Sequence, residues 1–157
     1  MTDTVTKARR SEIMAAVRGK DTKPERKVRS FLHSNGLRYR LHAKDLPGKP
    51  DLVFPKYRTV VFINGCFWHG HADCKLARMP KSNVKFWNDK IQANKDRDKM
   101  NNKRLRALDW RVITVWECKL SPRDLNRLMG SIKKAGTRID PAAHPWRKRL
   151  GRRAYIK

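Results

Sequence analysis

The sequence has few acidic residues, few cysteines and no long hydrophobic run, and each shortage restricts what the protein can be. Only 14 Asp and Glu accompany 39 Lys and Arg, which leaves a formal net charge of +25 at pH 7. Because self-repulsion of this size destabilises a compact chain, we expect a polyanionic partner. DNA or RNA fits first, and an acidic membrane surface is a distant second.

The hydrophobic runs are too short for a membrane protein. Residues 13–17 and 60–63, two of the longest runs, cannot cross a bilayer, and residues 1–10 lack the hydrophobic stretch of a secretory signal. We therefore expect no membrane partner and a cytoplasmic location. The 3 cysteines are odd in number and cannot form a closed disulfide framework, so metal binding or plain burial must account for them.

The chain is long enough for one hydrophobic core. Its 157 residues are 39% hydrophobic and include 5 Trp, which predicts a single domain. We place this domain at residues 1–136. Residues 137–157 are basic with few hydrophobic side chains, and we expect a flexible tail that binds phosphates without specificity.

Hydrophobic periodicity predicts an α/β chain. Thr22 would cap a helix that ends near Ser34, and Ser82 would cap a long helix that ends near Leu108. The predicted order is helices 11–18 and 22–34, strands 37–41, 51–54 and 58–64, helix 82–108, a strand 110–116 buried on both faces, and a helix from Ser121.

The long predicted helix carries polar residues on an otherwise hydrophobic face. That face contains Val84, Trp87, Ile91, Leu105 and Leu108 at helical spacing. Asn94 and Asp98 fall on the same face, at its middle. Burial of an unpaired carboxylate is costly. Either this part of the face is solvated and Asp98 pairs with an arginine, or it borders a polar active site.

The segment GCFWHGHADC, residues 65–74, holds two cysteines and two histidines. Cys66, His71, Cys74 and Cys118 would make a tetrahedral Zn²⁺ site of three thiolates and one imidazole. His69 could replace His71, and chance clustering of buried cysteines is the alternative. Because every cysteine of the chain falls at a ligand position, the pattern favours structural zinc. A closed site leaves no position for water, so the chemistry must lie elsewhere.

Pro50-Asp51 heads a predicted strand, where metal-dependent nucleases of the PD-(D/E)xK type carry their first acid. Pro-Asp is equally an ordinary turn dipeptide. The acid and lysine that complete the motif are absent from the next strand, where Phe62, Ile63 and Asn64 stand. Either this is not a nuclease site, or other groups substitute for the missing ones.

Several segments together resemble the very-short-patch repair (Vsr) DNA mismatch endonucleases, which are similar in fold to restriction endonucleases. The segments are RSEIMAAVRGKDTKPE, LRYRLH, LPGKPDLVFPKYRTVVFINGCFWHGH, PKSNVKFW and DWRVITVWEC, and they extend from about Arg10 to about Cys118. GCFWHGH and VWEC are specific motifs. The resemblance implies a restriction-endonuclease-like α/β domain with a central mixed sheet, flanking helices and a structural zinc site.

The resemblance also implies an active site. Asp51 and the backbone carbonyl of Ile63 would bind a catalytic Mg²⁺. His69 would activate the attacking water and would be oriented by Asp98. Glu25 and Asn94 would hold metal-bound waters, and Cys66, His71, Cys74 and Cys118 would bind the zinc. Such an arrangement suits phosphodiester hydrolysis, because histidine accepts protons near neutral pH and Mg²⁺ offsets developing negative charge.

Phe67 and Trp68 follow a predicted metal ligand and precede a predicted catalytic histidine, a place that suits a wedge between bases better than a core. Unstacking a base step costs about a few kcal/mol, and least at a mismatch. By resemblance, Phe67, Trp68 and Trp87 enter the major groove beside a T:G mismatch, Met14 enters the minor groove, and Lys90 contacts a base. Trp87 and Met14 would also suit ordinary core packing.

The sequence therefore predicts a Mg²⁺-dependent endonuclease that nicks one DNA strand 5′ to the T of a T:G mismatch. Because such mismatches arise when 5-methylcytosine deaminates, the resemblance implies a cytosine-5 DNA methyltransferase as a functional partner, mismatch-repair proteins as further partners, and a location at the bacterial nucleoid. A single nick needs only a monomer. Asn64 stands where the family often has histidine, which predicts weaker activity. The alternatives are a noncatalytic zinc module that recognises distorted duplexes, and an RNA-binding protein.

Overall fold

Helix α2 (Lys23–Ser34) shows how local sequence signals set the ends of an element. Thr22 is its N-cap, and the Thr22 hydroxyl accepts the backbone N–H of Glu25. Pro24 lies in the first turn, where a missing N–H is harmless. The chain leaves the helix through Gly36, whose φ of +80° favours glycine. These features match the predicted helix 22–34.

The computed structural model describes residues 6, 8, 9, 11, 12, 20–41 and 43–134. The predictions for Met14, for most of helix 11–18 and for the tail 137–157 lie outside these residues. After α2 the elements are β1 (Arg40–Leu41), β2 (Leu52–Phe54), the 3-10 turn η1 (Pro55–Tyr57), β3 (Thr59–Asn64), η2 (Lys75–Ala77), α3 (Val84–Ala107), β4 (Arg111–Trp116) and α4 (Pro122–Lys133).

The central sheet is mixed, as predicted. Its strand order is β1-β2-β3-β4. β1 pairs antiparallel with β2, and β2 pairs antiparallel with β3. β3 and β4 are parallel, so α3 provides the long crossover that parallel neighbours require.

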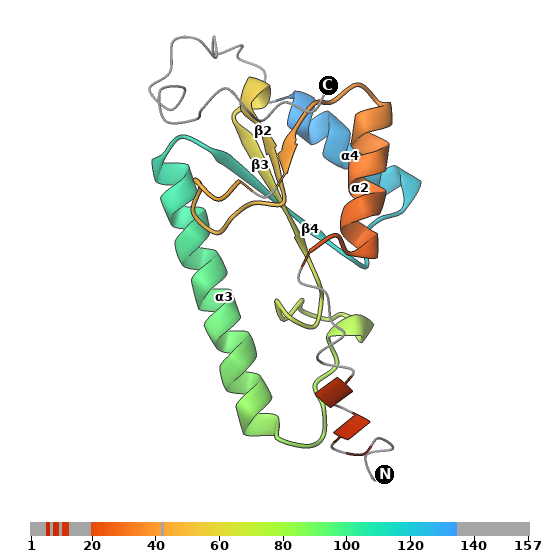
Figure 1. Ribbon diagram of the computed structural model, residues 1–157, viewed down its shortest axis with the longest axis vertical. Coiled ribbons are helices and arrows are strands. Elements are labelled where there is room, and N and C mark those ends of the chain that lie inside the picture. Colours follow the sequence, from red (N-terminus) through yellow and green to blue (C-terminus); the bar gives the residue numbers. More distant parts are fainter. Residues whose placement is uncertain (1–5, 7, 10, 13–19, 42, 135–157) are drawn as a thin grey trace.

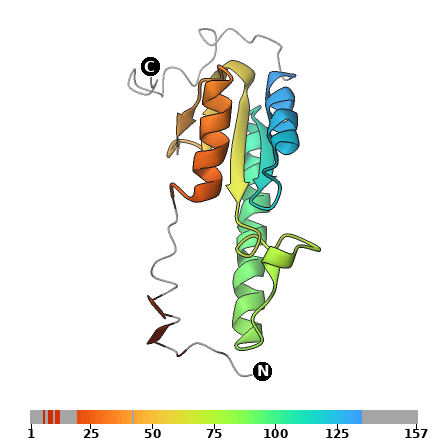
Figure 2. The same cartoon turned by 90° about the vertical axis from the view of Figure 1, so that its right-hand side faces the viewer.

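Each face of the sheet packs against a different helical layer (Figures 1 and 2). Side chains alternate between the faces along a strand. One core contains Leu52, Phe54 and Val61 of the sheet with Val28 and Leu32 of α2 and Leu125, Leu128 and Ile132 of α4. The opposite face contributes Val53 and Val60, which pack with Leu105 of α3 and Trp110. The result is a three-layer α/β/α arrangement.

Three details of the predicted elements are wrong. Strand 37–41 is reduced to β1, because the Leu37 N–H still bonds to the last turn of α2. Ser82 does not cap α3: Asn83 is the N-cap, with φ +53° and no side-chain capping bond, in a backbone conformation that Asn tolerates. β4 is not buried on both faces, because it forms an edge of the described sheet, and only Val115 in it is buried.

Helix α3 is much longer than the sheet is deep. Its 24 residues extend for about 36 Å at about 1.5 Å per residue, and its N-terminal half runs past the strands beside the chain that follows β3 (Figure 1). Of the predicted hydrophobic face, Ile91 and Leu105 are buried, but Val84 and Leu108 are 46% and 51% exposed. No helix among the described residues is long and hydrophobic enough to span a membrane.

Candidate active site and metal cluster

A cleft opens where the N-terminus of α2, the head of β2, the ends of β3 and β4 and the middle of α3 meet. Its lining includes the basic residues Lys20, Lys23, Arg26, Lys44, Lys49 and Arg97 and the acidic residues Asp21, Glu25, Asp51, Asp98 and Glu117. Its volume of about 1320 Å³ exceeds the roughly 300–1,000 Å³ of small-molecule pockets. The cleft therefore has room for a segment of a polymer, and its cations offset the repulsion that its acids exert on a polyanion.

His69 and Asp98 form a hydrogen-bonded pair in the wall of this cleft. The Nδ1 of His69 lies 2.5 Å from Oδ2 of Asp98. An ionised carboxylate only accepts, so a hydrogen bond to one has Nδ1 as its donor and leaves Nε2 as the ring nitrogen available to a water. Both side chains are partly exposed, at 29% and 34%. The pair can orient a base toward a water in the cleft, and Asp98 pairs with His69 rather than with an arginine.

The loop after β3 holds His69 against α3. His69 and His71 donate their backbone N–H groups to the carbonyls of Gly65 and Cys66. Gly70 has φ +57°, and a Cβ there would lie 2.7 Å from Cγ2 of Ile91 and closer still to Lys95. Only glycine therefore allows this approach.

Asn94 secures the same loop from α3. Its Nδ2 donates to the carbonyl oxygen of Trp68 over 2.9 Å. Asn94 therefore supports the loop at Trp68, the residue before His69. Asn94 is not among the residues that line the cleft.

Asp51 lies at the head of β2 and faces the next strand. Its Oδ2 accepts the backbone N–H of Ile63 over 2.7 Å, and both residues line the cleft. The two predicted Mg²⁺ ligands are therefore neighbours. A carboxylate and a backbone carbonyl together are a donor set of hard oxygens, which suits a Mg²⁺ that keeps several waters.

Glu25 borders the cleft but already has several partners. It is 4% exposed, and its carboxylate accepts the Thr22 hydroxyl at 2.9 Å, the Asp21 N–H at 3.1 Å and a guanidinium N–H of Arg29 at 2.7 Å. These bonds fix the start of α2. Glu25 also lines the cleft, so its structural role at the start of α2 and the predicted role of holding a metal-bound water are compatible.

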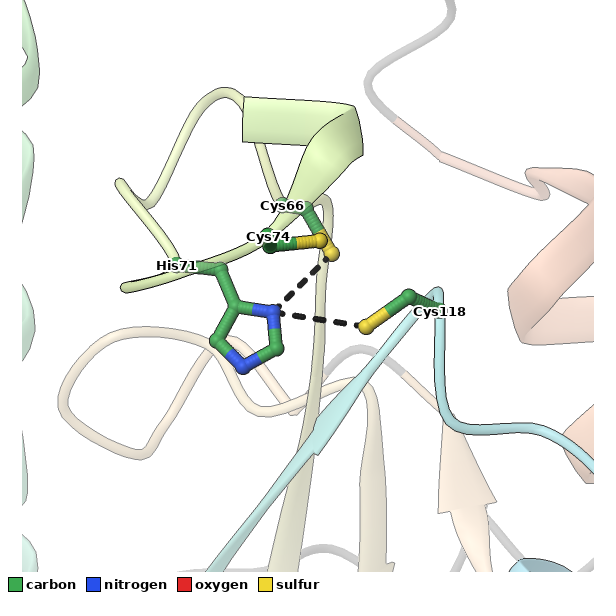
Figure 3. Close-up of side chains that lie close together, drawn as sticks. All are labelled: Cys66, His71, Cys74 and Cys118. Carbon is green, nitrogen blue, oxygen red and sulfur yellow. Dashed lines mark hydrogen bonds between the residues drawn. The ribbon is translucent and has the colours of Figure 1, made fainter. Parts of the chain in front are cut away.

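Four ligand side chains gather beside the cleft and could hold a metal ion. Cys66, His71, Cys74 and Cys118 place their ligand atoms within 4.8 Å of one another; we call them the metal cluster. Three come from the loop after β3, and Cys118 approaches from just beyond β4 (Figure 3). His71 Nδ1 lies 3.4 Å from Cys66 Sγ and 3.3 Å from Cys118 Sγ. His69, the alternative ligand, is bonded to Asp98 instead.

The surroundings of the metal cluster hold the His71 ring in place and bury the Cys66 thiol. The His71 ring stacks on Trp116, with centroids 4.2 Å apart and planes 6° apart. Burial raises the pKa of the Cys66 thiol to about 12. A thiolate at this buried position is unfavourable without a positive charge beside it, which a metal ion supplies.

The aromatic residues of the loop and of α3 pack edge to face rather than into a core. Phe67 contacts Trp68 and Trp87, with centroids 5.1 and 5.2 Å apart. Phe86, 58% exposed, adds a contact to Trp87 at 5.2 Å. Lys90 is exposed one turn further along α3. This half-exposed cluster is contiguous with the loop that carries His69.

Sequence reasoning missed several residues of the cleft. Glu117 lines it, and its Oε1 accepts the Cys66 N–H over 2.7 Å, so it ties the end of β4 to the loop. The signal was present in the VWEC motif, which contains Glu117 beside a predicted ligand. Lys49, Arg97 and Asn101 also line the cleft. No helical, strand or metal-binding pattern marks these three residues, and the tertiary fold brings Arg97 and Asn101 to the cleft.

Comparison with known proteins relates this architecture to one group of enzymes. A family model described as DNA mismatch endonuclease Vsr matches residues 2–76. The type II nicking enzyme V.XorIIP of Xanthomonas oryzae pv. oryzae is 49% identical over 142 residues, which cover 90% of this chain and 100% of that protein. The type II nicking enzyme V.NmeAIP of Neisseria meningitidis is 48% identical over 140 residues, which cover 86% and 99%. The DNA mismatch endonuclease Vsr of Escherichia coli is 44% identical over 124 residues, which cover 79% of each chain.

Proposed function

This chain belongs to the Vsr family of DNA mismatch endonucleases, and from that premise we propose that it nicks one strand of duplex DNA 5′ to the T of a T:G mismatch, with Mg²⁺ as cofactor. Its relatives are named as endonucleases and nicking enzymes. The noncatalytic zinc module and the RNA-binding protein therefore lose their support.

The observation that carries the proposal is the pairing of His69 with Asp98 in a cleft shared with Asp51. Nε2 of His69 takes a proton from the attacking water. Asp98 holds the imidazole in the required tautomer and stabilises the imidazolium that forms. The basic lining of the cleft retains the DNA backbone while this proton moves.

Mg²⁺ fits the oxygen donors at Asp51 and Ile63. When bound, it supplies a positive charge that offsets the charge developing on the phosphate. Asp51, held by the Ile63 N–H, fixes the position of that charge on the sheet. We assign Glu25 to its water shell, and the domain to the restriction-endonuclease-like fold. Asn94 is predicted to share that water shell, but it lies outside the cleft lining and bonds to the Trp68 carbonyl, so we assign it to support of the loop that carries His69.

Zinc fits the metal cluster. Zn–S bonds of about 2.3 Å and Zn–N bonds of about 2.0–2.1 Å place tetrahedral ligand atoms about 3.5–3.8 Å apart. The two distances from His71 Nδ1, 3.3 and 3.4 Å, lie close to this range. Four protein ligands would close the coordination shell, so we assign a structural role to the zinc.

We assign mismatch recognition to the aromatic cluster. The cluster presents the ring edges and faces of Phe67, Trp68 and Trp87. These rings can enter between bases, where they stack in place of the base contacts that a mismatched base pair has already lost. Lys90 would contact a base, and Met14 would enter the opposite groove. We propose that the protein acts on mismatches that follow from the work of a cytosine-5 DNA methyltransferase, and that mismatch-repair proteins are its further partners. We also propose that it acts as a monomer at the bacterial nucleoid.

The test is cleavage of labelled duplexes that differ only in one T:G or T:A pair, placed in several sequence contexts. We expect a Mg²⁺-dependent cut in the T strand of the T:G duplexes alone. Asp51→Ala should reduce this cut below detection and leave mismatch binding intact. Asp96→Ala, an exposed acid of α3 outside the cleft, should cut normally. Equal cutting of T:A duplexes, or persistent cutting by Asp51→Ala, would refute the assignment.

A further inference from the structure

Besides a bound Mg²⁺, a cationic side chain at the substrate phosphate favours phosphodiester cleavage, and the strand residues that line the cleft supply no such side chain. The strand residues that line the cleft are Phe62, Ile63, Asn64 and Thr114. Every cation of the cleft therefore comes from a loop or a helix, and the question is which one is held beside Asp51.

Lys49 is the cleft cation whose position is tied most closely to Asp51. The two residues are two positions apart, so their Cα atoms are separated by no more than about 7 Å. Lys44, the next nearest in the chain, precedes Asp51 by seven positions. The flexible four-carbon stem of Lys49 can thus bring its ammonium group to a phosphate held at Asp51.

The backbone at Lys49 is held in an uncommon conformation. Its φ is +50° and that of Gly48 is +74°, and a residue with a Cβ rarely adopts such values. The Lys49 N–H bonds to the carbonyl of Leu46 at 3.1 Å, and Leu46 packs against the core on the α3 side. Pro50 is fully buried. Local strain that is held from both sides is typical of functional positions.

Contact with α3 completes this support. A Cβ on Gly48 would lie 3.0 Å from Cβ of Asn101, so the loop rests directly on the helix that carries Asp98. Among the described residues the Lys49 ammonium has no hydrogen-bond or ion-pair partner, and the side chain is exposed. It is therefore available to an anion.

We infer that Lys49 is a catalytic residue: its ammonium group binds the scissile phosphate beside Asp51 and offsets the charge that develops on the nonbridging oxygens. This inference rests on the proposed function and names a further group in the same site. It also accounts for the motif lysine that is absent from β3, because a cation from the loop before Asp51 takes its place.

The test compares Lys49→Gln with Lys44→Gln, which removes the same charge from the same cleft wall. Single-turnover nicking is measured at saturating enzyme, and binding is measured without Mg²⁺, on whichever mismatched duplex the unaltered protein cuts. Lys49→Gln should slow the saturated rate by ~10²-fold or more, with a change in Kd of less than ~5-fold. Lys49→Arg, which keeps the charge, should recover part of the rate.

The controls separate this role from general charge loss. Lys44→Gln should weaken binding and slow the saturated rate by less than ~3-fold, as expected for a nonspecific phosphate contact. Lys56→Gln, in η1 outside the cleft, should leave both unchanged. The inference is overturned if Lys49→Gln cuts at the unaltered rate once saturated, or is slowed no more than Lys44→Gln. Whether the substrate is a T:G or another mismatch is decided by which duplexes the unaltered protein cuts, so that result is independent of the Lys49 variants.

Discussion

The metal cluster and the cleft lie side by side, but they are built in different ways. Three of the four cluster ligands fall within residues 66–74, and Cys66 is fully buried. The cleft takes its groups from α2, from Asp51 just before β2, from β3, from the loop after β3 and from α3, and its pair of His69 and Asp98 is about one-third exposed. One region is fixed by a short loop and the other by the whole fold.

The two regions share the loop after β3, and we expect the cleft to depend on the metal cluster but not the reverse. His69 lies between Cys66 and His71 in the chain, so the metal cluster positions a residue of the cleft. No cluster ligand needs His69, Asp98 or Asp51. Damage to the cluster should therefore reach the cleft, whereas damage to the cleft should leave the cluster intact.

The largest effect is expected from Cys66→Ser. Loss of the buried thiolate should release the metal and lower the free energy of unfolding by more than about 4 kcal/mol. Nicking should fall by at least ~10²-fold, because His69 loses its support and small misplacements of catalytic groups are costly. Metal content, thermal unfolding and nicking rate check this expectation.

Asp73→Asn is the control for Cys66→Ser. Asp73 is an exposed residue of the same loop with φ +52°, which Asn tolerates, and it is not a ligand of the cluster. It should keep the metal and the activity. If Cys66→Ser retains one equivalent of metal and full activity, the dependence of the cleft on the cluster is wrong.

The second effect concerns the cleft alone. His69→Gln should lower the single-turnover nicking rate by about 10²–10⁴-fold, the usual contribution of a general base. Metal content and melting temperature should stay at the values of the unaltered protein. Loss of metal from this variant would show that His69, rather than His71, is a cluster ligand, and the comparison would then fail.

The two regions also differ in how far the sequence predicts them. The cluster follows from cysteine and histidine spacing, which needs only one long-range partner, Cys118. The caps at Thr22 and Ser121 are equally local, and both form. The surroundings of Asp98, by contrast, stay open in the sequence between a solvated face with an arginine partner and a polar active site, because a helical pattern shows which face a residue occupies but not what it meets. Only the family resemblance implies His69 as its partner.

Most features that could not be predicted from the sequence depend on tertiary contacts. The ion pair of Glu25 with Arg29 joins residues only four positions apart, but the burial of the Glu25 side chain depends on the packing of α2. Lys49 carries no helical or strand signal, although it lies two positions from Asp51 in the chain. Asn83, rather than Ser82, is the N-cap of α3, and its own backbone is left-handed. Preferences for capping residues do not predict this backbone conformation.

The smallest effect is expected where the two regions join. Gly70→Ala places a methyl group against Ile91 and forces an alanine into φ +57°, which should destabilise the protein by more than about 1 kcal/mol. The loop must move away from α3, so His69 is displaced from Asp98 while all four cluster ligands remain. We expect about a 10-fold slower nick with normal metal content.

Gly130→Ala is the matched control for Gly70→Ala. Gly130 lies within α4, and no atom lies within 4 Å of an added Cβ. Alanine there should stabilise the helix by about 0.5–1 kcal/mol and leave nicking unchanged. If Gly70→Ala also leaves nicking unchanged, the loop does not position His69 through its contact with α3. If instead Gly70→Ala loses metal, the cluster depends on that contact too, and the dependence between the two regions runs in both directions.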